Sequence, residues 1–158
     1  MPDDLYDRDI LAWSQHQAEL LRRVARGERV NNVDWQHVVE EIEDVGLSQL
    51  NAVQSYLRLM LVHLLKVRAW PHSLAVGHWR AEIVSFQADA AQRFAPSMGQ
   101  KIDVDRLYRI ALRQVSKARD DSGRDPLPLP QSCPCTLDQL LGEDSDTLET
   151  QITMASAG

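Results

Sequence analysis

Apolar residues recur along this chain at intervals of three and four positions, the spacing that places them on one face of an α-helix. Five segments show it: residues 6–26, 35–45, 48–69, 74–95 and 104–118. Helix-ending residues follow several of them, including Gly27, Pro71 and Pro96, and Gly46 is expected to stop or kink the helix at residues 35–45. No segment shows the strict alternation of a half-buried strand, so the pattern predicts an all-α protein.

The segment at residues 48–69 differs from the others because it carries two apolar stripes. One consists of Leu50, Val53, Leu57, Met60, Leu61 and Leu64; the other consists of Tyr56, Leu59, His63, Lys66 and Trp70. Two packed faces are typical of the central helix of a bundle. The segment at residues 35–45 has a single stripe, which we expect to face the core: Trp35, Val38, Val39, Ile42 and Val45.

The C-terminal third changes character. Residues 125–130 alternate proline with other residues and predict a stiff, extended strap. Thr136 and Gln139 have the spacing of a capping box, which predicts one short helix ending near Leu141. We therefore predict a single domain over residues 1–142, an antiparallel bundle of four to five helices with a short C-terminal helix after the strap. The acidic, then small and polar, residues 143–158 predict a disordered tail.

Charge and composition exclude several classes of function. Acidic residues outnumber basic ones, 23 to 17, which gives a net charge of −6 and argues against broad nucleic-acid binding. No apolar run approaches the ~20 residues of a membrane span, and the N-terminal residues do not have the pattern of a secretory signal. We expect a cytoplasmic protein with neither a membrane nor a nucleic acid as partner.

A cluster of charged residues is the first candidate for chemistry. Glu40 and Glu43 share one helix edge, and His63 is expected on the neighbouring helix. Inward glutamate and histidine side chains of a bundle can bind a divalent metal, whose bound water then serves in hydrolysis. Lys66 and Arg80 could hold an anionic substrate there. In the alternative interpretation, the acids neutralise nearby cations and His63 is a hydrogen-bonded core histidine.

Two further motifs have a structural and a chemical interpretation. Residues 66–72 and 78–80 interleave basic residues with Trp70 and Trp79, as phosphate- or base-binding surfaces do, but tryptophans in a turn between helices also bury apolar area. Cys133 and Cys135 flank one proline and have no second cysteine pair with which to complete a zinc site. We expect both cysteines to act as small buried residues that dock the strap.

Taken together, several short motifs resemble a known bacterial family. They are Tyr6, Asp9, Trp13, Gln17 and Leu20-Leu21; residues 39–43 with Gly46; residues 63–66; Trp79-Arg80; and Cys133-Pro134 before a leucine-containing helix. The set is similar to the family catalogued as domain of unknown function 29, over roughly residues 5–142. Cys135 stands where the family pattern usually has an aromatic residue. The resemblance implies a small, helical, bacterial protein and brings no assigned activity.

The sequence holds no recognised catalytic constellation, glycine-rich phosphate loop or nucleophile elbow. We therefore expect a non-catalytic interaction module that binds a protein partner or self-associates. The alternative is a metal-assisted hydrolase, acting for example on a phosphate ester, in which Glu40, Glu43 and His63 serve as ligands or base. The pattern alone does not identify the surface that a partner would use.

Overall fold

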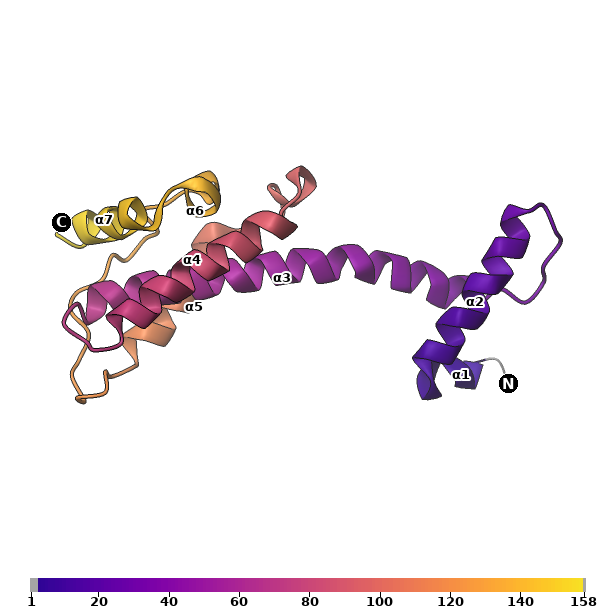
Figure 1. Ribbon diagram of the computed structural model, residues 1–158, viewed down its shortest axis with the longest axis horizontal. Coiled ribbons are helices and arrows are strands. Elements are labelled where there is room, and N and C mark those ends of the chain that lie inside the picture. The colour runs from indigo at the N-terminus through magenta and orange to yellow at the C-terminus, as the bar shows by residue number, and fades with distance from the viewer. Residues whose placement is uncertain (1–2, 158) are drawn as a thin grey trace. The chain divides into compact units, whose positions relative to one another are not determined.

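The computed structural model describes residues 3–157, which are helical with extended connections and contain no strand (Figure 1). The elements are α1 (Asp3–Arg8), α2 (Ile10–Ala25), α3 (Trp35–Ala69), α4 (Val76–Arg93), the 3₁₀ turn η1 (Pro96–Met98), α5 (Val104–Ser116), α6 (Leu137–Gly142) and α7 (Ser145–Ser156). The all-α fold class predicted from the sequence is confirmed.

The chain divides into two compact units, Met1–Ser48 and Gln49–Gly158, where the sequence predicted one domain over residues 1–142. Helix α3 contributes residues to both units, because the two helices expected at 35–45 and 48–69 are one continuous helix. Gly46, expected to separate them, has an ordinary helical backbone without a positive φ. A helical glycine costs only about 1 kcal/mol relative to alanine, which a long helix tolerates.

In the first unit, the expected helix at residues 6–26 is two helices. Asp9 separates them, and its carboxylate accepts a hydrogen bond from the backbone N–H of Ala12 at 2.9 Å, as the N-cap of α2. Gly27 ends α2 with a φ of 85°, a left-handed conformation that glycine adopts without strain. Trp13, Leu20 and Val38 are the buried apolar residues of this unit.

The second unit has a larger core, built around the C-terminal part of α3. Val53, Leu57, Met60, Leu61 and Leu64 are fully buried there, as the first of the two predicted stripes requires. The other helices contribute buried residues of their own, among them Ile83, Tyr108, Leu140, Leu148 and Ile152. Helices α6 and α7 both pack on α4.

Hydrogen bonds join the proline-rich strap, and Arg124 just before it, to the end of α3 and to α5. The backbone N–H of Leu127 donates to the carbonyl of Ala69 at 3.0 Å, and the indole of Trp70 donates to the carbonyl of Arg124 at 3.0 Å. The buried hydroxyl of Tyr108 donates to the carbonyl of Pro130 at 2.6 Å. The strap therefore supplies a donor to one of the carbonyls that the end of α3 leaves unpaired.

The residues after the strap form two helices, one more than predicted. The capping box of Thr136 and Gln139 is present and begins α6. The expectation of a disordered tail is wrong for the described residues 145–156, which form α7 with Leu148 and Ile152 in the core; Gly158 lies outside the described residues. These two apolar positions, four apart, give α7 a buried face that the acidic composition of the segment conceals.

Candidate functional site

The structure does not assemble the metal site suggested by the sequence. Glu40, Glu43 and His63 lie on one helix, with roughly six turns between Glu40 and His63, and not on two facing helices. Glu40 and Glu43 are exposed. Within residues 3–157, no group of three or more histidine, cysteine, aspartate or glutamate side chains is arranged to hold a metal ion. The hypothesis depended on a break at Gly46 that does not exist.

His63 is hydrogen-bonded, as the alternative interpretation stated, but it is half-buried beside the core and not a member of it. Its Nδ1–H donates to the carbonyl of Leu59 at 2.7 Å, because a carbonyl can only accept. Its ring lies 5.4 Å from that of Phe86. Burial lowers the pKa of His63, so the ring is neutral at physiological pH.

The two basic candidates have partners other than Glu40 and Glu43. The ammonium of Lys66 lies 5.6 Å from the ring centre of Trp79, a cation–π contact. The guanidinium of Arg80 donates from Nε and Nη2 to the two oxygens of Glu149, at 2.9 and 3.0 Å. Arg80 therefore has its counter-ion on α7, a segment that the sequence analysis assigned to a disordered tail.

The tryptophans and cysteines follow their structural interpretations. Trp70 is buried and Trp79 half-buried, with ring centres 6.2 Å apart, at the turn between α3 and α4. The thiol of Cys135 is buried and donates to Oε1 of Gln151 at 3.3 Å. Burial raises the pKa of Cys133 and raises that of Cys135 to about 12, so neither is a thiolate at neutral pH.

A polar and aromatic cluster in the first unit was not found from the sequence. Asp34 Oδ2 accepts from the indole of Trp13 at 3.0 Å and from Nδ1 of His37 at 2.7 Å. The backbone N–H of Asp34 donates to Oε1 of Gln17 at 2.8 Å, which gives the buried amide its partner. The ring of Tyr6 stacks on His37, 3.8 Å between centres. The sequence does contain one signal for this cluster: Asp34 stands just before a predicted helix and His37 follows three residues later, the spacing of a helix N-cap contact.

The electrostatics of this cluster follow from its hydrogen bonds. Burial alone would raise the pKa of Asp34, but the donors of His37 and Trp13 outweigh it and the pKa is lowered. The same bond to Asp34 raises the pKa of His37. The hydroxyl of Tyr6 donates to Oε1 of Glu41 at 2.6 Å, which raises the pKa of Tyr6 to about 12. Each polar group has a partner, and the cluster fixes α1 and α2 against one face of α3.

Another face of the same part of α3 is apolar and uncovered. Trp35, Val39, Ile42 and Val45 are 55%, 50%, 67% and 67% exposed. The periodic pattern predicted that these positions face the core together with Val38, but of the five only Val38 is buried. We call these four residues the α3 stripe. Because they recur at helical spacing, they form one continuous strip along the helix.

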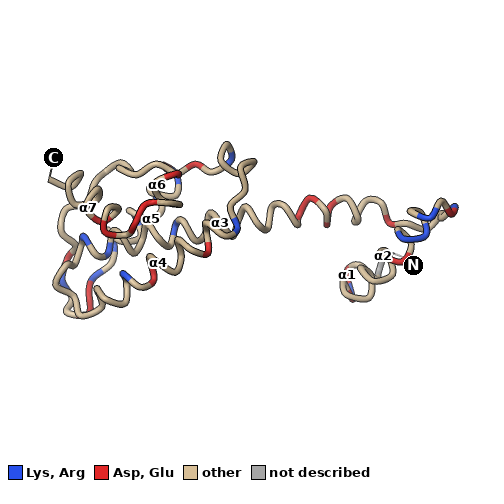
Figure 2. Tube along the Cα trace, turned by 45° about the horizontal axis from the view of Figure 1, so that its top comes forward, with Lys and Arg blue, Asp and Glu red and all other residues tan. Residues whose placement is uncertain are grey.

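Charge is separated along α3. Its acidic residues are Glu40, Glu41, Glu43 and Asp44, all in the N-terminal part beside the α3 stripe, while its basic residues Arg58, Lys66 and Arg68 follow later (Figure 2). Of the acids, Glu41 is held by Tyr6, whereas Glu40, Glu43 and Asp44 are exposed. The α3 stripe is therefore an apolar surface with an acidic border.

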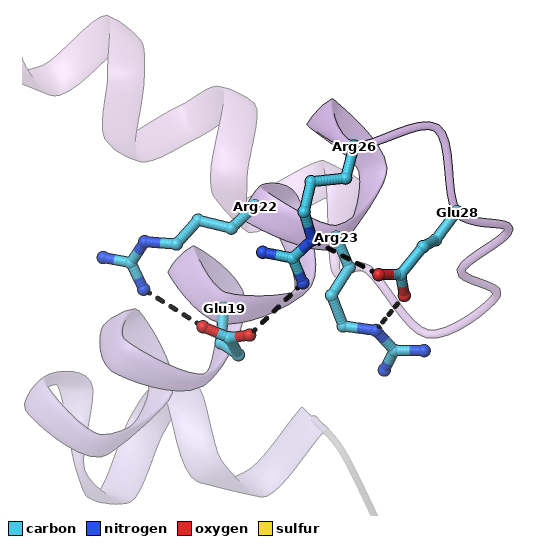
Figure 3. Close-up of polar contacts among 5 residues, drawn as sticks. All are labelled: Glu19, Arg22, Arg23, Arg26 and Glu28. Atoms are coloured by element: carbon cyan, nitrogen blue, oxygen red, sulfur yellow. Dashed lines mark hydrogen bonds and ion pairs between the residues drawn. The ribbon is translucent and has the colours of Figure 1, made fainter.

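Three arginines of the first unit, Arg22, Arg23 and Arg26, lie at the end of α2 and have acidic partners. Glu19 lies between Arg22 and Arg26, at 3.3 and 3.9 Å, and Glu28 accepts from Arg23 at 2.8 Å (Figure 3). The hydrogen bond from Arg23 lowers the pKa of Glu28. All these side chains are substantially exposed, so the network defines local shape more than stability.

Comparison with known proteins places the chain in a family. The family model described as a domain of unknown function, DUF29, matches residues 5–145. The chain belongs to the DUF29 family. A solved structure is also similar to this chain: an α-helical protein of unknown function from Rhodospirillum rubrum ATCC 11170 is 27% identical, with a TM-score of 0.65, and the match covers 93% of this chain and 96% of that one. Among curated proteins there is no match.

The sequence-based resemblance to DUF29 is thus confirmed. The family description and the solved structure name no activity, so neither assigns a catalytic residue to this chain. In the part of the chain that the structure describes, no helix combines the length and apolar character needed to span a membrane.

Proposed function

We propose that this DUF29 protein is a non-catalytic interaction module of the bacterial cytoplasm, whose binding surface is the α3 stripe. The observation that carries the proposal is the exposure of Trp35, Val39, Ile42 and Val45 on one helix face. Four large apolar residues, each at least half exposed on one helix face, form a patch of a few hundred Å², and the largest apolar patch of a monomer, about 300–600 Å², is often functional.

The occupant of the stripe is an amphipathic helix of another protein with basic residues along its borders. A standard protein–protein interface buries about 800 Å² on each partner, which is more than the apolar area of the α3 stripe. A single amphipathic helix that contacts residues at helical spacing therefore fits the stripe and its border better than a broad protein surface does. Glu40, Glu43 and Asp44 would meet the basic border. A second copy of this chain is disfavoured as occupant, since pairing two α3 stripes brings two acidic borders together.

Titration with designed peptides tests the proposal. The probes are a helical peptide of leucine and lysine and a matched peptide of leucine and glutamate, both without tryptophan, so that the exposed Trp35 reports binding by fluorescence. We expect saturable binding of the basic peptide and none of the acidic one. Ile42→Glu should abolish the response, because it places a charge in the centre of the stripe.

The control separates stripe binding from charge attraction. Val84 on α4 is 54% exposed, so Val84→Glu adds the same charge at a similar exposed apolar position of the second unit. Equal binding by the two variants would show nonspecific attraction to an acidic protein and overturn the proposal. Sedimentation that shows a dimer dissociated by Ile42→Glu would assign the stripe to a second copy and overturn the basic partner.

A further inference from the structure

We propose that a hollow in the second unit, between the end of α3, α4 and α7, binds a small oxyanion, either a carboxylate or a phosphate group. The hollow has a volume of about 170 Å³. Its polar lining comes from Arg68, Arg80, Glu149 and Thr153, and its apolar lining includes Leu64 and Val67. For comparison, an engineered cavity of about 150 Å³ in another protein accepts benzene, so the hollow has room for a ligand of several heavy atoms.

Arg68 is the cation that lacks a partner in this hollow. Its Nε is buried and has no hydrogen-bond acceptor. No ion pair or hydrogen bond to its other guanidinium atoms is found within residues 3–157. A buried donor without an acceptor is unfavourable, and an arginine fork matches the paired oxygens of a carboxylate or phosphate.

Arg80 and Glu149 determine the net charge of the hollow. Arg80 engages both oxygens of Glu149, which is only 16% exposed, so this carboxylate already has its cation. Among the residues that line this hollow, two guanidinium groups and one carboxylate leave one positive charge, at Arg68; Asp146 lies outside the lining, although its charge acts on Arg80. The pair also holds the guanidinium of Arg80 at the wall of the hollow, which Thr153 lines as well.

The surroundings also determine which end of a ligand enters. A second hollow of about 280 Å³ shares Glu149 and Thr153 with the first and is also lined by Asp146. A negative group there would be repelled by Asp146. A ligand longer than the oxyanion would therefore place its charged end at Arg68 and its neutral part along α7.

Nuclear magnetic resonance of the arginine Nε–H groups of the full chain tests this site. Inorganic phosphate and acetate are titrated separately against chloride at constant ionic strength. We expect saturable shifts of the Arg68 and Arg80 signals with at least one of the two anions, and none with chloride. Tighter binding of phosphate or of acetate identifies which oxyanion the site prefers. Arg109, exposed on α5, is the internal control and should not respond.

Two variants separate a specific site from general attraction. Arg68→Gln should weaken binding by roughly tenfold or more, as loss of a charge-assisted hydrogen bond implies, whereas Arg109→Gln should have no effect. Arg68→Lys keeps the charge without the fork and should also weaken binding. An unmoved Arg68 signal would show that no anion binds there and would overturn the site. Shifts shared equally by exposed arginines would mean an adventitious ion only and would also overturn it. The wild-type titration gives either result even if a variant fails to fold.

Discussion

Replacing Leu148 by alanine tests whether α7 is an integral part of the second unit. Leu148 is fully buried, although the composition of residues 143–158 predicted disorder. The substitution removes about three methylene equivalents, worth roughly 0.8 kcal/mol each in lost transfer free energy. The cavity left behind adds about 1 kcal/mol if the neighbours relax partly. We expect the free energy of unfolding to fall by about 3 kcal/mol.

Urea unfolding followed by far-ultraviolet circular dichroism measures this loss. With a slope of roughly 1–3 kcal/mol per molar urea, the midpoint should fall by about 1 M or more. Because two units can unfold at different urea concentrations, hydrogen exchange of peptides from α5 assigns the affected transition to the second unit.

The matched control is Met154→Ala on the same helix. Met154 is 72% exposed, so its truncation should change stability by no more than about 0.5 kcal/mol. If Leu148→Ala is as mild as Met154→Ala, then α7 does not contribute to the core, and the site proposed beside it loses its Glu149 wall.

Three other outcomes are expected. Tyr108→Phe should cost about 1–3 kcal/mol in urea melts, because it leaves a buried strap carbonyl without its donor; an unchanged midpoint would show that water replaces the hydroxyl. Ionised Asp34 and His37 should stabilise the first unit most between pH 3.8 and 6.5, their usual pKa values. This stabilisation is lost as pH rises through the raised pKa of His37 or falls through the lowered pKa of Asp34; pH-dependent melts of His37→Gln and of exposed His16→Gln should differ accordingly. Cys135, with a pKa of about 12, should react with iodoacetamide only after denaturation, and fast labelling of the native protein would contradict its burial.

Local sequence signals were sufficient to predict those features of the fold that depend on contacts between residues close in sequence. Asp103 directly precedes the periodic segment at residues 104–118, and its carboxylate accepts a hydrogen bond from the backbone N–H of Arg106 as the N-cap of α5. The capping box of Thr136 is formed in the same way. Both involve contacts only three residues apart, which the sequence displays directly.

The errors arose where the outcome depends on distant residues. A periodic stripe indicates an amphipathic helix, but it does not say whether another segment covers that face. Among residues 3–157, no segment buries Trp35 or Ile42. The partner of Arg80 is Glu149, which lies 69 residues away and has no local signature. The cluster around Asp34 likewise joins residues from three helices and could not be derived from spacing alone.

The sequence separation of the long-range hydrogen bonds determines when each unit has all of its residues during synthesis. In the first unit, the contact between Tyr6 and Glu41 spans 35 residues, so this unit has its sequence complete once Ser48 has been synthesised. In the second unit, the hydrogen bond from Trp70 to Arg124 joins residues 54 positions apart, and the hydrogen bond from Gln87 to Glu143 joins residues 56 positions apart. During synthesis the sequence of the first unit is therefore complete before the segments that cover the apolar α3 residues of the second unit exist. During that interval Leu57, Leu61 and Leu64 are exposed on a growing chain, and this is when it is most vulnerable to aggregation and has most need of a chaperone.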